Sequence, residues 1–408
     1  MRPPLNLPLH IIEPTLVGTA GHCHSLVQAL AAAAPECDTT VWAGQRAAGP
    51  WTGPGRLLPY FSRRWRRLQT GWLLRRLMGQ PGRILVTTAG STDLLLAGWA
   101  AAGTIAPRKL FLFVHWLGNK PAKARWLSAM ARRQPHIEIL APSTAVADFF
   151  SACGFNSTVV PYPVQADPAA NTQSDTESGP DIGTDTGTGT GTGTGTDTDT
   201  DTDTGTGSGT DNSTGTGIAA APAFRHLLAA GGARLDKGFD RVVDLVVEMQ
   251  RLGLRWPITV QTSLEPRQRL DPALAQQMAR LRHCGYAGLR LCDSALTPQD
   301  YRALFAGAIA IQPYRADDFK DRVSGVTLDA LGAGAPVIVT AGTWMARLVQ
   351  RFGAGVATDD LSPSGLLKAV QQVMADPAGH ASRARLAAAT VQGEHSARRF
   401  MDVVLDRT

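Results

Sequence analysis

The chain has 408 residues, of which 44% are apolar and 18% charged, so it is long enough for two to three globular domains. No stretch reaches the about 18 uninterrupted apolar residues of a membrane-spanning helix, and the Pro-rich first ten residues lack an apolar signal core, so we expect no export. The five cysteines are scattered and odd in number, which indicates free thiols in a reducing, cytoplasmic compartment.

The net charge of +6 is unevenly distributed along the chain. Residues 174–217 hold nine acidic residues and no Lys or Arg. Without them, 40 basic residues face 25 acidic ones, a net charge of about +15. A surplus of this size suits an anionic ligand or surface, such as nucleotide phosphates, anionic lipid or nucleic acid.

The first half of the chain alternates short apolar runs with helical patterns. The runs predict strands at residues 9–12, 39–42, 84–86, 110–115 and 137–140, and the patterns between them predict helices at residues 22–34, 93–102 and 121–133. Because the apolar runs are continuous rather than alternating, they indicate a parallel sheet that is covered on both faces.

Residues 61–78, FSRRWRRLQTGWLLRRLM, combine six arginines with no acid and place Phe61, Trp65, Leu68 and Trp72 at helical spacing. Such a helix suits the surface of an anionic membrane, on the inner face of which the protein would be peripheral. A surface helix that packs its aromatic face inward explains the pattern equally well, whereas no recognised nucleic-acid-binding module surrounds it. The arginines that would meet the lipid are Arg63, Arg64, Arg66, Arg67, Arg75 and Arg76.

Residues 174–217 are almost entirely Gly, Thr, Asp and Ser. This composition cannot bury enough apolar surface to offset its ordering entropy, so it predicts a disordered linker. We therefore expect an N-terminal domain over residues 1–173, a C-terminal domain over 218–394, and a last helix over 395–408 that packs back on the N-terminal domain.

The second half repeats the alternation. Strands are expected at residues 226–230, 258–260, 289–291, 308–312 and 336–340, with helices at 239–252 and 301–307. The predicted fold class is therefore α/β, with two doubly wound, Rossmann-like parallel-sheet domains that face each other across a cleft.

The strongest functional pattern lies in residues 313–340, PYRADDFKDRVSGVTLDALGAGAPVIVT. Ser324 is a suitable N-cap, Gly325 leaves the backbone open, and Val326 follows in the first helical turn. A helix start of this kind binds phosphate through free N–H groups, and Arg322 adds positive charge. Asp321 and Asp329 flank this start with seven residues between them.

A second pattern is residues 231–238, GGARLDKG, which form a Gly-rich turn between a strand and a helix. Gly232 allows close approach of a ligand, and Arg234 and Lys237 suit a diphosphate, because Arg supplies forked hydrogen bonds and Lys a point charge. A basic turn without a ligand is an equally good interpretation of this pair.

These residues resemble the donor-binding domain of retaining glycosyltransferases of family 4, which have the GT-B fold. The resemblance covers about residues 224–373 and includes the Arg…Lys-Gly turn, the two spaced acids and the strand that follows Asp329. Both acids are Asp where the family has Glu, and the turn is shorter than usual. The resemblance implies that Asp329 accepts hydrogen bonds from the ribose, that Arg234 and Lys237 neutralise the leaving diphosphate, and that Asp321 takes the place of the first acid.

The N-terminal half resembles the acceptor domain of that family more weakly. Gly21 ends a Gly-Thr-Ala-Gly loop, His115 closes the strand at residues 110–115, and residues 160–163 lead out of the domain. The resemblance implies that Gly21 contacts the donor and that His115 is catalytic. A histidine at the end of an apolar strand is, however, more often a satisfied core residue.

The function implied is transfer of a sugar from a nucleoside-diphosphate sugar to a hydroxyl of a glycan or lipid-linked acceptor, as in polysaccharide biosynthesis, with retention of configuration. Positive side chains and helix-end amides would stabilise the leaving group, so we expect no metal and no cofactor besides the nucleotide-sugar substrate, and no nucleic-acid partner. A non-catalytic sugar-nucleotide-binding protein and a sugar-nucleotide epimerase remain alternatives. The adjacent residues His22, Cys23 and His24 point in different directions in regular structure and have no distant partner ligands, which is unlike a metal site.

Overall fold

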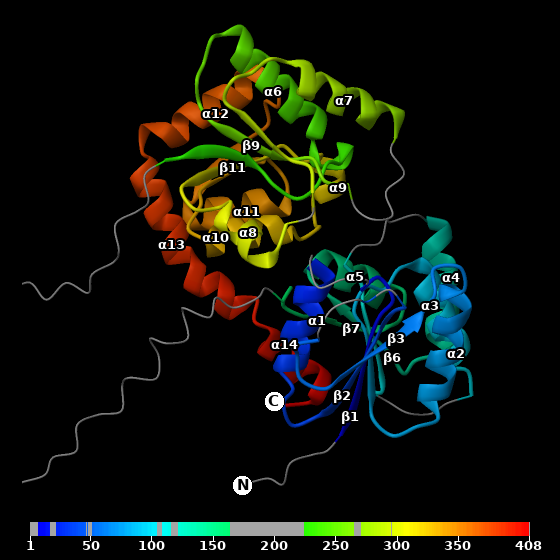
Figure 1. The fold of residues 1–408 in the computed structure, drawn as a ribbon. Coiled ribbons are helices and arrows are strands. Elements are labelled where there is room, and N and C mark those ends of the chain that lie inside the picture. Colours follow the sequence, from blue (N-terminus) through cyan, green and yellow to red (C-terminus); the bar gives the residue numbers. More distant parts are fainter. Residues whose placement is uncertain are drawn as a thin grey trace, which may run out of the picture. The chain divides into compact units, whose positions relative to one another are not determined.

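The computed structural model describes residues 7–16, 22–45, 47, 51–103, 108–115, 121–163, 224–264, 271–294 and 296–407 (Figure 1). Within these residues the chain forms two separate β-sheets, one from each half, and every strand pairing in both sheets is parallel. The predicted fold class, with two doubly wound α/β domains, is confirmed. The expected linker at residues 174–217 lies outside the described residues.

The first sheet has seven strands in the order β3-β2-β1-β4-β5-β6-β7. The strands are β1 Pro8–Glu13, β2 Asp38–Gly44, β3 Arg56–Phe61, β4 Arg83–Val86, β5 Leu110–Phe113, β6 Ile137–Ala141 and β7 Asn156–Val159. The helices that connect them are α1 His22–Ala32, α2 Arg66–Met78, α3 Ser91–Ala100, α4 Pro121–Arg133 and α5 Thr144–Ala152.

The second sheet has six strands in the order β10-β9-β8-β11-β12-β13. The strands are β8 His226–Ala229, β9 Ile258–Gln261, β10 Leu289–Cys292, β11 Ala308–Gln312, β12 Val337–Thr340 and β13 Gly355–Thr358. The helices are α6 Phe239–Arg251, α7 Pro272–His283, α8 Pro298–Ala303, α9 Ala316–Phe319, α10 Gly325–Gly332, α11 Trp344–Phe352, α12 Pro363–Ala375, α13 Pro377–Glu394 and α14 Ala397–Leu405, with a 3₁₀ turn η2 at Leu235–Lys237.

Successive strand residues in the central strands enter cores on opposite faces of each sheet. In β5, Phe111 belongs to the core that includes α1 and α14, and Leu112 belongs to the core that includes α2, α3, α4 and α5. In β11, Ala310 faces the core of α8, α10 and α11, and Ile311 faces the core of α6, α7 and α12. Both faces are buried, which explains why these strands are continuously apolar in sequence.

The last helix, α14, packs against the first sheet and its helix α1 (Figure 1). The ring of Phe400 is fully buried and meets Phe113 of β5 edge to face, with 5.0 Å between the ring centroids. Arg83 at the start of β4 forms an ion pair of 2.6 Å with Asp406 just beyond the helix. The final residues of the chain therefore complete a core that the first half begins.

Three expected details differ in the structure. Residues 61–78 are not one helix, because Phe61 ends β3 as a buried residue and α2 begins only at Arg66. The helix expected at 301–307 instead spans Pro298–Ala303, because Thr297 caps it by accepting from the Asp300 N–H and Pro298 occupies its first turn. The edge strands β3, β7 and β13 were not predicted.

Candidate functional site

The two patterns singled out in the second half lie at the same edge of the second sheet. The strand order reverses between β8 and β11. From β8 the chain adds β9 and β10 on one side of the sheet, and from β11 it adds β12 and β13 on the other side. The turn at residues 231–238 leaves the carboxyl end of β8, and the segment that leads to α10 leaves the carboxyl end of β11. In open α/β sheets, this reversal point is where ligands bind.

Gly231 lies at the closest approach of the two segments. Its φ of +98° is a conformation that other L-residues rarely adopt, and its N–H donates to Gln261 Oε1 at 2.8 Å. A Cβ added at Gly231 would lie 2.8 Å from Val326 Cγ2, 3.1 Å from Lys237 Nζ and 3.8 Å from the Tyr314 hydroxyl. The glycine-rich turn, the start of α10 and the end of β11 therefore converge on one backbone position.

Lys237 and Gly238 hold this turn in shape. Lys237 Nζ donates to the Gly231 carbonyl oxygen at 2.7 Å and lies 5.9 Å from the centroid of the Tyr314 ring. Gly238 has a φ of +66°, and an added Cβ would come 2.0 Å from the Pro313 carbonyl oxygen, so the turn packs directly on the chain that leaves β11. The ammonium group of Lys237 is thus fixed beside the Gly231 backbone.

Asp236 links two of the predicted arginines. Its carboxylate accepts from Arg234 Nε at 2.9 Å and forms a longer contact of 3.5 Å with Arg322. Burial alone would raise the pKa of Asp236, but the hydrogen bond and charge of Arg234, together with the charges of Arg322 and Lys237, outweigh burial and lower it. Asp236 therefore stays ionised and orients both guanidinium groups.

The start of α10 has the predicted geometry. Ser324 is its N-cap and accepts from the Thr327 N–H at 3.3 Å, and Gly325 and Val326 form the first turn. Thr327 in turn donates to Gln312 at the end of β11 at 2.5 Å, which anchors the helix start to the sheet. Arg322 precedes the cap, with its guanidinium 4.7 Å from the centroid of the Phe319 ring.

Asp329 lies in the second turn of α10 and accepts a hydrogen bond of 3.1 Å from the Tyr301 hydroxyl of α8. Burial raises the pKa of Asp329 to about 6, although the Tyr301 hydrogen bond and the charges of Arg302 and Lys237 act in the opposite direction. The charge of the Asp329 carboxyl group therefore changes with pH not far below neutrality. The sequence interpretation named neither Asp236 nor Tyr301 as a site residue.

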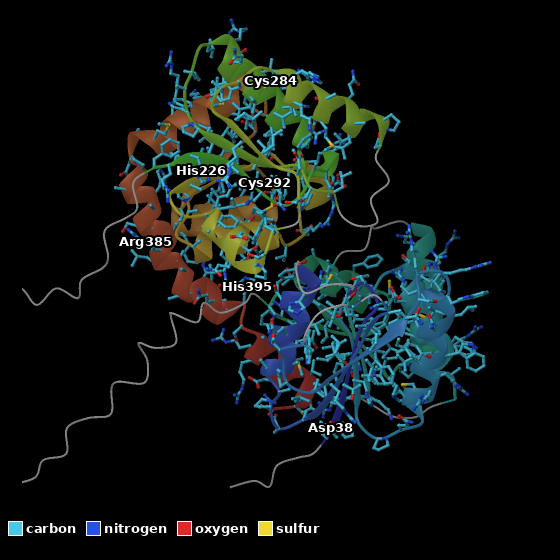
Figure 2. The ribbon with its side chains drawn as sticks, in the orientation of Figure 1. Asp38, His226, Cys284, Cys292, Arg385 and His395 are labelled. Carbon is cyan, nitrogen blue, oxygen red and sulfur yellow. The ribbon has the colours of Figure 1, made fainter. Side chains whose placement is uncertain are left out.

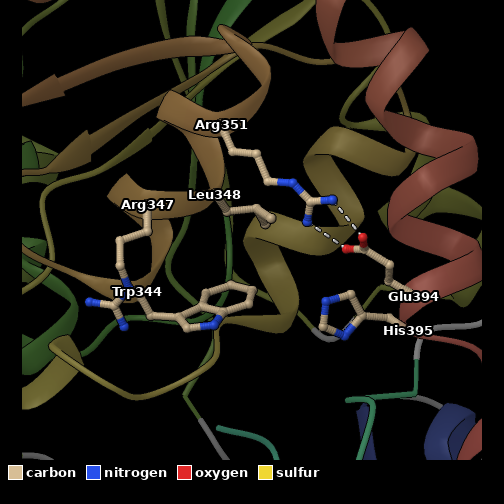
Figure 3. A pocket seen from close by; sticks show the side chains of 6 residues that line it. All are labelled: Trp344, Arg347, Leu348, Arg351, Glu394 and His395. Atoms are coloured by element: carbon tan, nitrogen blue, oxygen red, sulfur yellow. Dashed lines mark hydrogen bonds and ion pairs between the residues drawn. The ribbon is translucent and has the colours of Figure 1, made fainter. Parts of the chain in front are cut away.

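Asp321 is placed differently from Asp329. It forms an ion pair of 3.2 Å with Arg347 of α11, and about a third of its side chain is exposed. Arg347 also lines a pocket of about 270 Å³ between α11 and the end of α13 (Figure 3). Across this pocket Arg351 forms two hydrogen bonds with Glu394, while Trp344 faces His395 edge to face. The structure therefore brings Asp321 to α11 rather than to Asp329.

The first sheet also gathers polar groups where its strand order reverses, between β1 and β4. The buried carboxylate of Glu13 accepts from Thr87 Oγ1 at 2.8 Å and from Thr88 Oγ1 at 2.6 Å. His115 Nε2 donates to the Thr87 carbonyl oxygen at 2.9 Å, so Nδ1 is the acceptor nitrogen of its ring. Burial lowers the pKa of His115 to about 4, so its ring is neutral at physiological pH. Of the predicted glycines, Gly232 has a φ of +68°, and an added Cβ there would lie 3.2 Å from the Ser263 carbonyl oxygen, whereas Gly21 lies outside the described residues.

The five cysteines are free thiols, including Cys284 and Cys292 in the second half (Figure 2). Within the described ranges, no cluster of three or more His, Cys, Asp or Glu side chains is arranged to hold a metal ion. None of the helices in that part of the chain is long and apolar enough to span a bilayer.

No protein-family model and no curated protein sequence matches the chain. Solved structures match its fold over nearly its full length. Sucrose-phosphate synthase from Thermosynechococcus elongatus matches with 12% identity and a TM-score of 0.64 over 98% of this chain and 97% of that chain. Anabaena HepE in complex with UDP and glucose matches with 12% identity and a TM-score of 0.63, over 98% and 100%. WaaG, a glycosyltransferase of lipopolysaccharide biosynthesis, matches with 13% identity and a TM-score of 0.60, over 97% and 99%. At these identities the likeness shows the fold, which is GT-B.

Proposed function

We propose that this protein is a glycosyltransferase that moves a sugar from a nucleoside-diphosphate sugar to a hydroxyl group of a glycan or lipid-linked acceptor. The observation that carries the proposal is the convergence on Gly231, where Lys237, Val326 and Tyr314 all approach one backbone position. Two predicted anion-binding segments thus meet at the strand-order reversal of a GT-B sheet. The Anabaena structure of the same fold contains UDP and glucose, which supports a nucleotide-sugar donor.

In this proposal the departing diphosphate is stabilised by positive charge and backbone amides. Lys237 supplies a fixed ammonium group, and Arg234 and Arg322 supply guanidinium groups held by Asp236. The N–H groups of Gly325 and Val326, at the positive end of the α10 dipole, would hold a phosphate or the sugar. Such preorganised donors stabilise developing negative charge without a metal ion.

Asp329 would accept hydrogen bonds from the ribose hydroxyls, and the hydrogen bond from Tyr301 would orient its carboxylate. His115 and Asp321 are proposed to act at the reacting sugar, with retention of its anomeric configuration. His115 would act through its neutral form, with Nδ1 as the acceptor atom. The assignment of these two residues rests on the family resemblance.

The test is a donor screen followed by product analysis. Nucleoside-diphosphate sugars with different bases and sugars are compared by thermal shift, since a ligand at a hundredfold excess over its Kd stabilises the native state by about 2.7 kcal/mol. Binding donors are then radiolabelled and incubated with hydroxyl acceptors, with and without EDTA. Transfer of label identifies a glycosyltransferase, an epimerised donor in the absence of acceptor identifies an epimerase, and binding with neither reaction identifies a binding protein. Absence of any stabilising nucleotide sugar would refute all three.

A further inference from the structure

Five large apolar side chains, on α2, on α3 and at the N-cap of α2, are more than half exposed, at 51% to 66%. We call them the tryptophan patch, which consists of Trp65, Leu68, Trp72, Leu95 and Trp99. The opposite sides of the same helices already supply the core, with Leu73, Leu77 and Leu94 buried. The exposed set is therefore not needed to pack these helices, and it contradicts the interpretation in which the aromatic face of this segment points inward.

The patch is assembled by a close contact between α2 and α3, which lie side by side (Figure 1). Gly71 faces α3, and an added Cβ there would lie 3.2 Å from Leu96 and 3.5 Å from the Trp99 ring. The glycine lets the helices approach, so the rings of Trp72 and Trp99 meet edge to face with centroids 5.9 Å apart. Side chains from two helices thus form one continuous apolar surface.

The surroundings of the patch are strongly basic. Residues 61–78 contain six arginines and no acid, and the one acid of α3, Asp93, accepts from the Gly90 N–H at 3.0 Å. Arg63, Arg64 and Arg67 are exposed beside the tryptophans, and the Arg64 guanidinium lies 5.4 Å from the centroid of the Trp65 ring. Arg75 donates to the carbonyl oxygens of Ala100 and Ala102 and so closes the end of α3.

We propose that the tryptophan patch and the arginines around it dock the protein on an anionic lipid bilayer. Tryptophan rings favour the headgroup level of a membrane, where an apolar ring and a polar N–H are both accommodated, and leucines enter the acyl boundary. Arginine binds lipid phosphate by forked hydrogen bonds. Charge complementarity selects this occupant over a second copy of the chain, because two copies of the patch would bring equal sets of arginines together.

The test uses the full chain in flotation assays with vesicles of phosphatidylcholine alone or with 30% phosphatidylglycerol. We expect binding to the anionic vesicles, weakened at high salt, and little binding to phosphatidylcholine. Trp72→Ser with Trp99→Ser, and separately Arg63→Gln with Arg67→Gln, should each lower partitioning about tenfold or more. Matched controls are Leu252→Ser with Leu386→Ser, and Arg255→Gln with Arg290→Gln, which alter exposed residues of the second half and should leave partitioning unchanged.

Only variants whose melting temperature equals that of the wild type are compared. A blue shift of tryptophan fluorescence when vesicles are added provides a second measurement of binding. The proposal is overturned if the wild-type protein does not float with anionic vesicles, or if both patch variants bind as the wild type does. A Trp72- and Trp99-dependent dimer without vesicle binding would also overturn it, as would binding only to a mixed-sequence oligonucleotide.

Discussion

The hydroxyl of Tyr301 donates a 3.1 Å hydrogen bond to the carboxylate of Asp329, so two helices, α8 and α10, fix one titrating group. We expect the affinity for a nucleoside-diphosphate sugar to fall as the pH decreases through about 6, because protonation removes the carboxylate that we propose accepts from the ribose hydroxyls. In Asp329→Asn the affinity should be lower at pH 7.5 and should no longer change between pH 5 and 7. Calorimetry across this range measures both effects.

Tyr301→Phe extends this prediction, because the Tyr301 hydrogen bond lowers the pKa of Asp329. Removing the hydroxyl should move the pH at which affinity falls upward. Asp359→Asn, which changes an exposed carboxylate elsewhere in the same domain, serves as the control and should behave as the wild type. If affinity in the wild type and in Asp329→Asn responds identically to pH, Asp329 does not contact the ligand.

A Cβ at Gly231 should block the donor site. Gly231→Ala places a methyl group 2.8 Å from Val326 and 3.1 Å from Lys237 Nζ, so we expect nucleotide-sugar affinity to fall by about tenfold or more. The matched control is Gly253→Ala, which has a φ of +65° but no neighbour within 4 Å of the added Cβ. Both variants should lose about 1 kcal/mol of stability from backbone strain, but only the first should lose affinity. Equal affinities in the two variants would place the donor elsewhere.

Loss of positive charge in the turn after β8 should slow the reaction more than it weakens binding. Arg234→Ala and Lys237→Ala should each reduce kcat by about one to three powers of ten, because each removes a group that would stabilise the leaving diphosphate. Steady-state kinetics with a donor identified by the screen, with Arg255→Ala as a surface control, measures the effect. Turnover close to that of the wild type in both variants would mean that the diphosphate does not lie at this turn.

The contact of Phe400 with Phe113 should make a large contribution to stability. Phe400 is fully buried, so Phe400→Ala is expected to lower the free energy of unfolding by about 3 to 5 kcal/mol. Leu386→Ala removes a side chain that is 64% exposed on α13 and should change stability little. Urea denaturation of both variants checks the difference, and a similar midpoint for the two would show that α14 adds little to the core.

The central part of each sheet could be predicted from sequence, because strands buried on both faces are continuously apolar. The three missed strands are all edges: β3, β7 and β13 are largely exposed or half-buried along their length. β7 and β13 include Asn, Ser or Gly, so no apolar run marks them, and Pro59 in the middle of β3 is unfavourable in a strand except at a sheet edge. Residues 61–78 show a related difficulty. Phe61, at the end of β3, happens to lie at helical spacing from Trp65 and Leu68, so the pattern did not reveal that α2 begins only at Arg66.

The candidate site could be predicted only where its residues are close in sequence. The turn at 231–238 and the start of α10 were recognisable because glycine, cap and charge occur within a few positions of one another. Asp236 lay within that turn, but its role depends on Arg322, which only folding brings to it. Tyr301 reaches Asp329 from another helix, and no local pattern in the sequence specifies such a contact.

The packing of α14 on the first sheet has a consequence for the order in which the protein folds. The first half leaves the ribosome long before Phe400, Met401 and Val404, which are fully buried residues of its core. At synthesis rates of about 5 to 20 residues per second, residues 164–405 take roughly 10 to 50 s to make. During that interval the face of the first sheet that α14 will cover stays open to solvent. A chain that is truncated before Ala397 would keep that apolar face exposed, which makes it a substrate for chaperones and for aggregation.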